Sequence, residues 1–187
     1  RRRARLARAR NRLAAFALDA GGWGVFLLLD SDLLAYPRDL VPLLLAADAD
    51  VVAPYVSDPS RVLYDKNSWA HSNASRAAFD ALPADALVVQ GGYDKPTTYV
   101  VDAAGAKAPR DLGIRHLDAL RGEGERYPRL DAVGTACLLV RRWVLEGFDA
   151  FPDELVDHLL ESEGFGALAR TRGFSVVADL GVEVVHA

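Results

Sequence analysis

Two aspartates, Asp30 and Asp32, stand one residue apart directly after the apolar run Val25–Leu29. That run has the length and composition of a strand buried on both faces. Because residues i and i+2 of an extended chain point the same way, both carboxylates can converge just beyond the strand. Ligands bind at that edge of open α/β sheets, and paired carboxylates suit Mg²⁺ or Mn²⁺ beside a phosphate. The pattern also allows a helix cap at Asp32 and a solvated turn at Asp30.

A second group of polar and aromatic side chains falls within residues 55–72, which are predicted to form a loop. Aromatic rings beside amides and carboxylates are typical of a sugar or nucleotide surface. The alternative is that Trp69 packs onto the core and has a structural role. The side chains concerned are Tyr64, Asp65, Lys66, Asn67, Ser68, Trp69 and His71.

Two further acids, Glu161 and Glu163, begin a predicted helix over residues 161–172, which Gly173 is expected to terminate. Acids at the amino end and arginines at the carboxyl end complement the helix dipole. A purely structural role therefore explains these acids as well as a chemical one does.

The amino-terminal residues predict a helix that positions basic side chains. Residues 1–12 contain seven arginines and no acid, whereas the whole chain carries a net charge of −4. The remainder is therefore strongly acidic, which argues against binding to a nucleic-acid backbone. Apolar residues at helical spacing predict an amphipathic helix over residues 1–19 with a basic outer face. The predicted apolar face consists of Leu6, Leu13, Phe16 and Ala17.

Composition is that of a globular chain able to bury a sizeable core, with 187 residues of which 51% are hydrophobic. The apolar runs are too short to span a membrane. The single cysteine, Cys137, lies in the apolar stretch 133–140, so a buried, unreactive thiol is expected there.

Helical and strand patterns alternate along the rest of the chain, which predicts an α/β fold with a mostly parallel sheet. Gly134 is expected to mark a close backbone approach. Helices are predicted at 39–46, 74–82, 111–120 and 141–146, strands at 50–54, 130–140, 174–180 and 182–185, and a turn at 90–94.

Several of these stretches together resemble glycosyltransferase family 62, the fungal mannan polymerase subunits with a GT-A fold. They occur in the family's order over nearly the whole chain, and two of the motifs are far more specific than an Asp-x-Asp pair. The matching stretches are Leu28–Asp32, Tyr64–Trp69, Val133–Thr135, Gly147 with Phe151 and Pro152, Glu161–Gly166 with Ala169, and His186.

The resemblance implies one GT-A-like, Rossmann-like domain over residues 1–187, with a mixed, mostly parallel sheet flanked by helices. The family usually has a membrane anchor and further strands before the arginine-rich helix, so the domain is expected to lack its first strands. Thr135 stands where the family pattern has a second glycine.

The activity that the resemblance implies is a retaining α-mannosyltransferase. Its donor would be GDP-mannose, its metal Mn²⁺ or Mg²⁺ and its acceptor a glycan. Its location would be the Golgi lumen, with membrane attachment only through the absent anchor and with homo- or hetero-oligomers as partners.

The resemblance also implies roles for individual residues. Asp30, Asp32 and His186 would hold the metal, with Asp30 also facing the donor. Glu163, with Glu161 behind it, would lie near the reacting carbon. The residues expected to line the donor or acceptor groove are Tyr64, Asp65, Asn67, Trp69 and Gly134.

Two other functions remain open from the sequence. A haloacid-dehalogenase-type phosphatase also begins with an apolar strand ending in Asp-x-Asp, and Asp30 would then be the nucleophile. That family usually has Thr or Val two positions after the second acid, where this chain has Leu34. The other alternative is a non-catalytic subunit or fragment of a glycosyltransferase complex.

Overall fold

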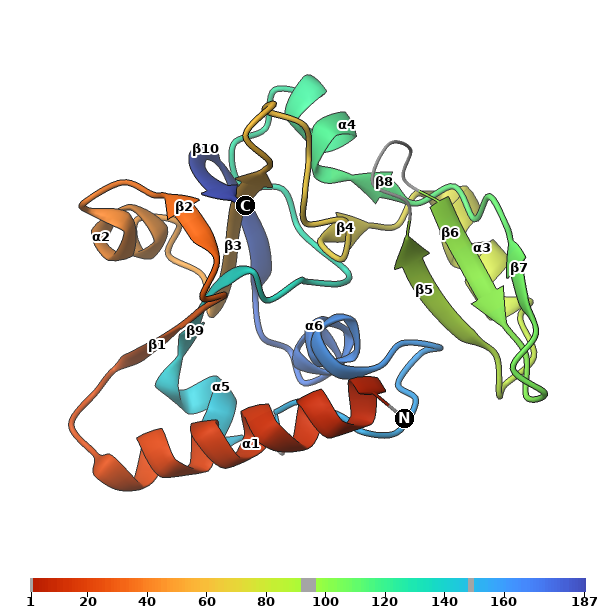
Figure 1. Ribbon diagram of the computed structural model, residues 1–187, viewed down its shortest axis with the longest axis horizontal. Coiled ribbons are helices and arrows are strands. Elements are labelled where there is room, and N and C mark those ends of the chain that lie inside the picture. Colours follow the sequence, from red (N-terminus) through yellow and green to blue (C-terminus); the bar gives the residue numbers. More distant parts are fainter. Residues whose placement is uncertain (1, 92–96, 148–149) are drawn as a thin grey trace.

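The computed structural model describes residues 2–91, 97–147 and 150–187, with a five-stranded sheet at the centre (Figure 1). The strand order is β1-β9-β3-β10-β2. These strands are β1 (Val25–Leu29), β9 (Cys137–Arg141), β3 (Val51–Ser57), β10 (Val176–His186) and β2 (Leu33–Ala35). Two smaller sheets contain β4 (Trp69–Ala70) with β8 (Arg115–His116), and β5 (Leu87–Gly91), β6 (Thr97–Val101) and β7 (Lys107–Pro109).

The central sheet is mixed and is flanked by helices, as predicted. Parallel pairing is less extensive than expected, because among the described strands only β3 and β10 run parallel. Strand β9 is antiparallel to both β1 and β3, and β2 is antiparallel to β10. The long connection from β3 to β9 contains helices at Asn73–Asp80 and Leu117–Gly122, and β9 nevertheless runs antiparallel to β3. The alternation of helices and strands therefore did not determine the direction of this strand.

Alternate residues of the central strands supply cores on the two faces of the sheet. Val51 and Ala53 of β3 face one core, and Val52 and Val56 face the other, which also contains Leu44. The first core is covered by α1, α5 and α6, which lie together in Figure 1. The helices are α1 (Arg2–Ala20), α2 (Leu40–Leu45), α3 (Asn73–Asp80), α4 (Leu117–Gly122), α5 (Arg142–Glu146) and α6 (Glu161–Thr171).

Helix α1 forms as predicted, but the wrong face was assigned to the core. Ala7 is fully buried, and Ala14 and Leu18 pack against the same core. In contrast, Leu13 is 68% and Phe16 is 75% exposed. Small residues let α1 approach α6 closely, so the helix packs through its alanines and leaves the larger apolar side chains outside.

Strand β10 contains an irregularity that redirects its end. Asp179 lies opposite Pro54 of β3, but the next paired residue of β10 is Glu183, so residues 180–182 have no counterpart in β3. Asp179 is fully buried and accepts hydrogen bonds from Gly181 N and from the Arg126 guanidinium, at 3.0 Å each. A bulge of this kind bends the strand. The end of β10 consequently pairs with β2 rather than with β3 alone.

The remaining predictions differ from the structure mainly at element boundaries. The strand expected at 130–140 is restricted to β9, and the two carboxyl-terminal strands form the single bulged β10. The helix expected at 111–120 is α4, displaced to 117–122. Strand β1 is half-buried because it lies at the sheet edge. Of the predicted turn at 90–94, residues 92–94 lie outside the described residues, and 90–91 belong to β5.

No helix within the described ranges combines the length and the hydrophobicity that crossing a bilayer requires.

Candidate metal centre and adjoining pocket

Asp30, Asp32 and His186 converge where β1 and β10 end and β2 begins. Each offers one ligand atom, and the three atoms lie within 4.8 Å of one another. Nε2 of His186 is 3.0 Å from Asp32 Oδ1 and 3.8 Å from Asp30 Oδ2. The predicted convergence of the two aspartates is therefore confirmed, and a histidine 154 residues further along the chain joins them.

The bend in β10 brings His186 to this position. His186 pairs with Leu33 in β2, the residue directly after Asp32, and Ala187 N donates to Asp32 O at 3.0 Å. The imidazole is only 3% exposed and stacks on Tyr64, with 3.7 Å between ring centroids and 12° between planes. Backbone pairing and ring stacking together fix the orientation of the imidazole.

The hydrogen bond made by Nδ1 of the imidazole leaves Nε2 available to a cation. Nδ1 of His186 is 2.9 Å from the Ala187 backbone oxygen, which can only accept, so Nδ1 carries the proton. In the neutral ring, Nε2 then directs a lone pair at the Asp32 carboxylate. That arrangement repels unless a second proton or a metal ion lies between the two groups. Two carboxylates and an imidazole fit Mn²⁺ or Mg²⁺, with coordination positions left for phosphate or water.

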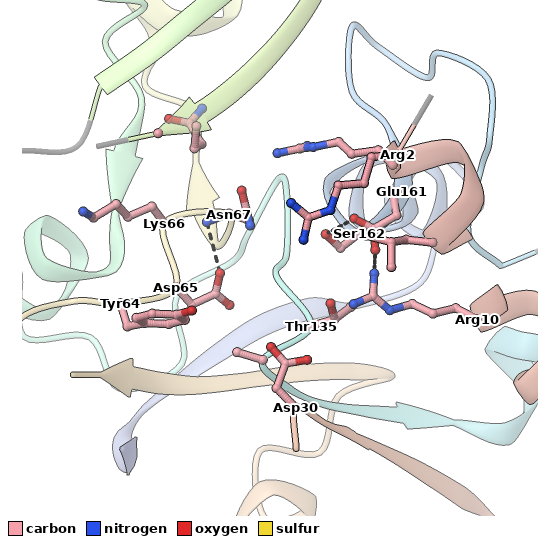
Figure 2. Close-up of a pocket in the computed structure, with 15 residues that line it drawn as sticks. Arg2, Arg10, Asp30, Tyr64, Asp65, Lys66, Asn67, Thr135, Glu161 and Ser162 are labelled. Atoms are coloured by element: carbon pink, nitrogen blue, oxygen red, sulfur yellow. Dashed lines mark hydrogen bonds and ion pairs between the residues drawn. The ribbon is translucent and has the colours of Figure 1, made fainter. Parts of the chain in front are cut away.

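A pocket of about 580 Å³ opens beside the metal centre. Figure 2 shows Arg2 and Arg10 entering from the α1 side, opposite Tyr64, Asp65 and Asn67. Asp30 belongs to both the metal centre and the pocket wall. The lining residues are Arg2, Arg3, Leu6, Arg10, Asp30, Tyr64, Asp65, Lys66, Asn67, Gln90, Gly91, Thr135, Ala136, Glu161 and Ser162.

Asp65 is a buried acid on this wall. Its carboxylate accepts hydrogen bonds from Asn67 N and Ser68 Oγ, both at 3.1 Å. Burial raises its pKa to about 6 despite these bonds. A Cβ at position 134 would overlap the carboxylate, which explains why a glycine stands there. Gly134 thus permits the close approach that was predicted, while its neighbour Thr135 lines the pocket.

The acids at the start of α6 lie in the opposite order to that expected. Glu161 lines the pocket and forms an ion pair with Arg10. Glu163 is fully buried behind it, where it pairs with Arg3 and accepts a hydrogen bond from Trp69 Nε1 at 3.2 Å. Burial raises the pKa of Glu163, and Arg3 acts in the opposite direction. Glu161 is therefore the acid that a bound molecule would meet.

Other predicted groove residues divide between the pocket and the core. Tyr64 and Asn67 line the pocket, whereas Trp69 is fully buried between the core and Glu163. Cys137 is buried as expected, and burial raises the pKa of its thiol to about 12.

The pocket residues that sequence reasoning missed come chiefly from α1. Arg3 and Arg10 are seven residues apart and flank the buried Ala7, so they lie on the packed face of the helix. The available signal was a second helical spacing, in which Arg3, Ala7, Arg10 and Ala14 share a face. This spacing alone does not show that the arginines face inward, because their acidic partners, Glu163 and Glu161, lie about 150 residues or more away in sequence.

Comparison with known proteins agrees with the resemblance found in the motifs. The sequence model of the Anp1 family matches residues 1–152, which is most of the chain. The chain belongs to the Anp1 family. Of the relatives, a Candida albicans "Vanadate resistance protein" is 31% identical over 186 residues, covering 94% of this chain and 38% of that protein.

Two further relatives of this Anp1-family chain are named as mannan polymerase subunits. The Saccharomyces cerevisiae "Mannan polymerase II complex ANP1 subunit" is 29% identical over 182 residues, or 94% of this chain and 34% of that protein. The Schizosaccharomyces pombe "Mannan polymerase complex subunit mnn9" is 30% identical over 178 residues, or 94% and 49%. The chain therefore spans between about a third and a half of the length of the curated relatives that it matches.

Proposed function

We propose that this chain carries the metal and donor site of a glycosyltransferase that moves mannose from GDP-mannose to a glycan acceptor. The observation that carries the proposal is the convergence of Asp30, Asp32 and His186 beside the pocket, in whose wall Asp30 also lies. Membership of the Anp1 family and the subunit names of its relatives support mannan synthesis as the process.

Mn²⁺ or Mg²⁺ would be held by Asp30, Asp32 and His186. The ion would neutralise charge on the departing nucleoside diphosphate, which leaves as a polyanion. Tyr64 orients the histidine through ring stacking, and the Ala187 backbone oxygen holds its tautomer. These contacts present a lone pair of Nε2 toward the aspartates, as metal binding requires.

Glu161 is the carboxylate placed to act on the sugar. It lies in the pocket wall, and carboxylates near the anomeric carbon stabilise an oxocarbenium-like transition state electrostatically. Glu163 is a positioning residue in this proposal, because its contacts with Arg3 and Trp69 anchor the start of α6. No general base is assigned, since in a retaining transfer the leaving phosphate oxygen can accept the acceptor's proton.

The proposal includes membership of a mannan polymerase-type complex in the Golgi lumen. Its support is the naming of the relatives as complex subunits and the family resemblance of the motifs. A subunit without catalytic activity agrees with those names equally well, so binding of the donor nucleotide is the property to test first.

The test is thermal unfolding of the chain with Mn²⁺ and GDP, alone and together. At a ligand concentration of about 100 Kd, binding adds about 2.7 kcal/mol and raises the melting temperature by roughly 5 to 10 °C. Asp32→Ala is expected to abolish that rise, because it removes a metal ligand. Asp39→Ala, an exposed aspartate with no side-chain cap hydrogen bond, is the matched control and should retain it.

The absence of any rise in the unaltered chain, with GDP or UDP and either metal, would refute the proposal. Stabilisation by UDP but not by GDP would retain a glycosyltransferase and exclude the mannose donor. Incorporation of phosphate on Asp30 from a phosphomonoester would instead identify the phosphatase.

A further inference from the structure

The basic residues of α1 fall into two groups with different surroundings. Arg8 is exposed and pairs with Asp153, with a side chain 65% exposed. The Arg10 side chain is only 19% exposed and reaches the pocket. Two arginines on the same helix, two residues apart, thus differ in whether they face solvent or a candidate substrate site.

Arg3 and Arg10 also differ in the surroundings of the acid that each contacts through Nη1. Arg3 pairs with Glu163, an acid that is fully buried and held from its other side by Trp69. Arg10 pairs through Nη1 with Glu161, an acid that lines the pocket. The Nε and Nη2 groups of Arg10 make no hydrogen bond to any residue in the described parts of the chain. A guanidinium has five N–H donors in a planar fork, so most of its donors remain for a ligand.

Arg10 lies between two acidic groups rather than beside one. Glu161 contacts Arg10 directly. Burial raises the pKa of Asp30, and the positive charge of Arg10 is the largest influence in the opposite direction. Figure 2 shows the side chain extending from α1 toward Glu161, with Thr135 beside its tip and Asp30 below. The guanidinium therefore faces the same space as the metal centre.

We propose that Arg10 is a substrate-positioning residue that binds the diphosphate of the nucleotide donor through its unoccupied N–H groups, while Glu161 holds the side chain in place. This inference rests on the proposed function. A nucleoside diphosphate carries more negative charge than one divalent cation balances, and a guanidinium binds phosphate oxygens in a bidentate geometry that no other side chain offers.

The two roles of Arg10 predict effects of opposite sign. Without nucleotide, the positive charge of Arg10 opposes a metal ion at Asp30, so Arg10→Gln should bind Mn²⁺ alone more tightly than the unaltered chain. With Mn²⁺ present, the same substitution should weaken GDP binding about 10-fold to 100-fold, as expected for a lost charge-assisted contact. A residue with only a structural role would weaken both or neither.

The experiment is isothermal titration of Mn²⁺, and then of GDP in saturating Mn²⁺, into four variants. Arg10→Gln tests the contact, and Arg10→Lys, which retains charge but lacks the fork, should bind GDP with intermediate affinity. Arg8→Gln removes the same charge from the exposed face and should change GDP affinity less than about 2-fold. Melting temperatures of the same samples report on folding.

The double variant Arg10→Gln/Glu161→Gln distinguishes the loss of a contact between Arg10 and GDP from the effect of leaving Glu161 without its partner. It removes both members of the buried pair, so it leaves no unpaired charge behind. Weak GDP binding by a folded double variant supports the inference, and recovery of the original affinity overturns it. Equal losses in the Arg8 and Arg10 variants, or unchanged GDP affinity in Arg10→Gln, also overturn it. If the unaltered chain fails to bind GDP with Mn²⁺, the proposed function itself is refuted.

Discussion

At the scale of single residues, the site depends on acids that differ in how deeply they are buried. Asp30 and Asp32 remain accessible to a ligand, whereas Asp65 is buried against Gly134 on two hydrogen bonds. Burial dominates the titration of Asp65 and raises its pKa from 3.8 to about 6. The protein thus keeps a carboxyl group of unusually high proton affinity in the wall of its pocket.

The raised pKa of Asp65 predicts a pH effect of definite sign. Between pH 4 and 6 the folded chain binds more protons than the unfolded chain, so the contribution of Asp65 to stability is full at low pH and is lost as pH rises through 6. Asp65→Asn does not titrate. Its free energy of unfolding, relative to the unaltered chain, should therefore increase from pH 4 to pH 7 by on the order of 2 to 3 kcal/mol.

Urea unfolding at several pH values measures this difference. Asp85→Asn, on an exposed turn, is the control for removing a carboxylate at the surface. A difference for Asp65→Asn that stays constant with pH would show that Asp65 is ionised in the folded chain throughout this range.

At the scale of elements, α1 shows what periodicity can and cannot predict. The sequence predicted the helix and its length, but two faces have helical spacing. One contains Leu6, Leu13 and Phe16, and the other contains Ala7 and Ala14. Hydrophobicity favours the first face. The second is buried because its alanines permit close packing and its arginines meet Glu161 and Glu163, which only the folded chain brings near.

Substitutions on the two faces of α1 should differ in how much they change stability. Phe16→Ala is expected to change the free energy of unfolding by less than about 0.5 kcal/mol, because that side chain is mostly exposed. Ala7→Leu should cost about 1 to 3 kcal/mol, because it overfills a fully buried position. Chemical denaturation of both variants provides the measurement, and a larger loss for Phe16→Ala would mean that α1 packs through its other face.

Other elements were predictable to different extents. Strand β1 and the convergence of its two aspartates followed from strand geometry alone. The approach of His186 came only from the family resemblance, since no local pattern reports a bulge that depends on Asp179 and Arg126. The order of Glu161 and Glu163 was not predictable, because both fit the same helix start and their burial is set by α1.

At the scale of the whole molecule, one edge of the central sheet adjoins an apolar surface. Strand β1 has β9 as its neighbour in the sheet and lies at the end of the strand order. A groove of about 340 Å³ runs between β1 and α1, with Leu13 and Ala17 on one side and Phe26 on the other. Edge strands beside exposed apolar side chains promote association between chains.

Self-association of the chain is therefore expected to depend on this surface. The double variant Leu13→Glu/Phe16→Glu should lower the apparent mass seen by light scattering at high concentration, because it places charge beside the groove. Val62→Glu introduces an acid at another exposed apolar position and is the control. If Val62→Glu lowers the apparent mass as much as the double variant does, the decrease is due to net charge alone.

Residues 180–182 of β10, which have no partners in β3, make the metal site sensitive to the number of residues between Asp179 and Glu183. A shift of one residue in β10 changes which side chain faces the aspartates. Deleting one residue between Asp179 and Glu183 would put Ala187 in the place of His186, and inserting one would put Val185 there. Such a change leaves every ligand in the sequence and still removes the third ligand from the site. When relatives are compared, the spacing that precedes the histidine is thus as informative about metal binding as the histidine itself.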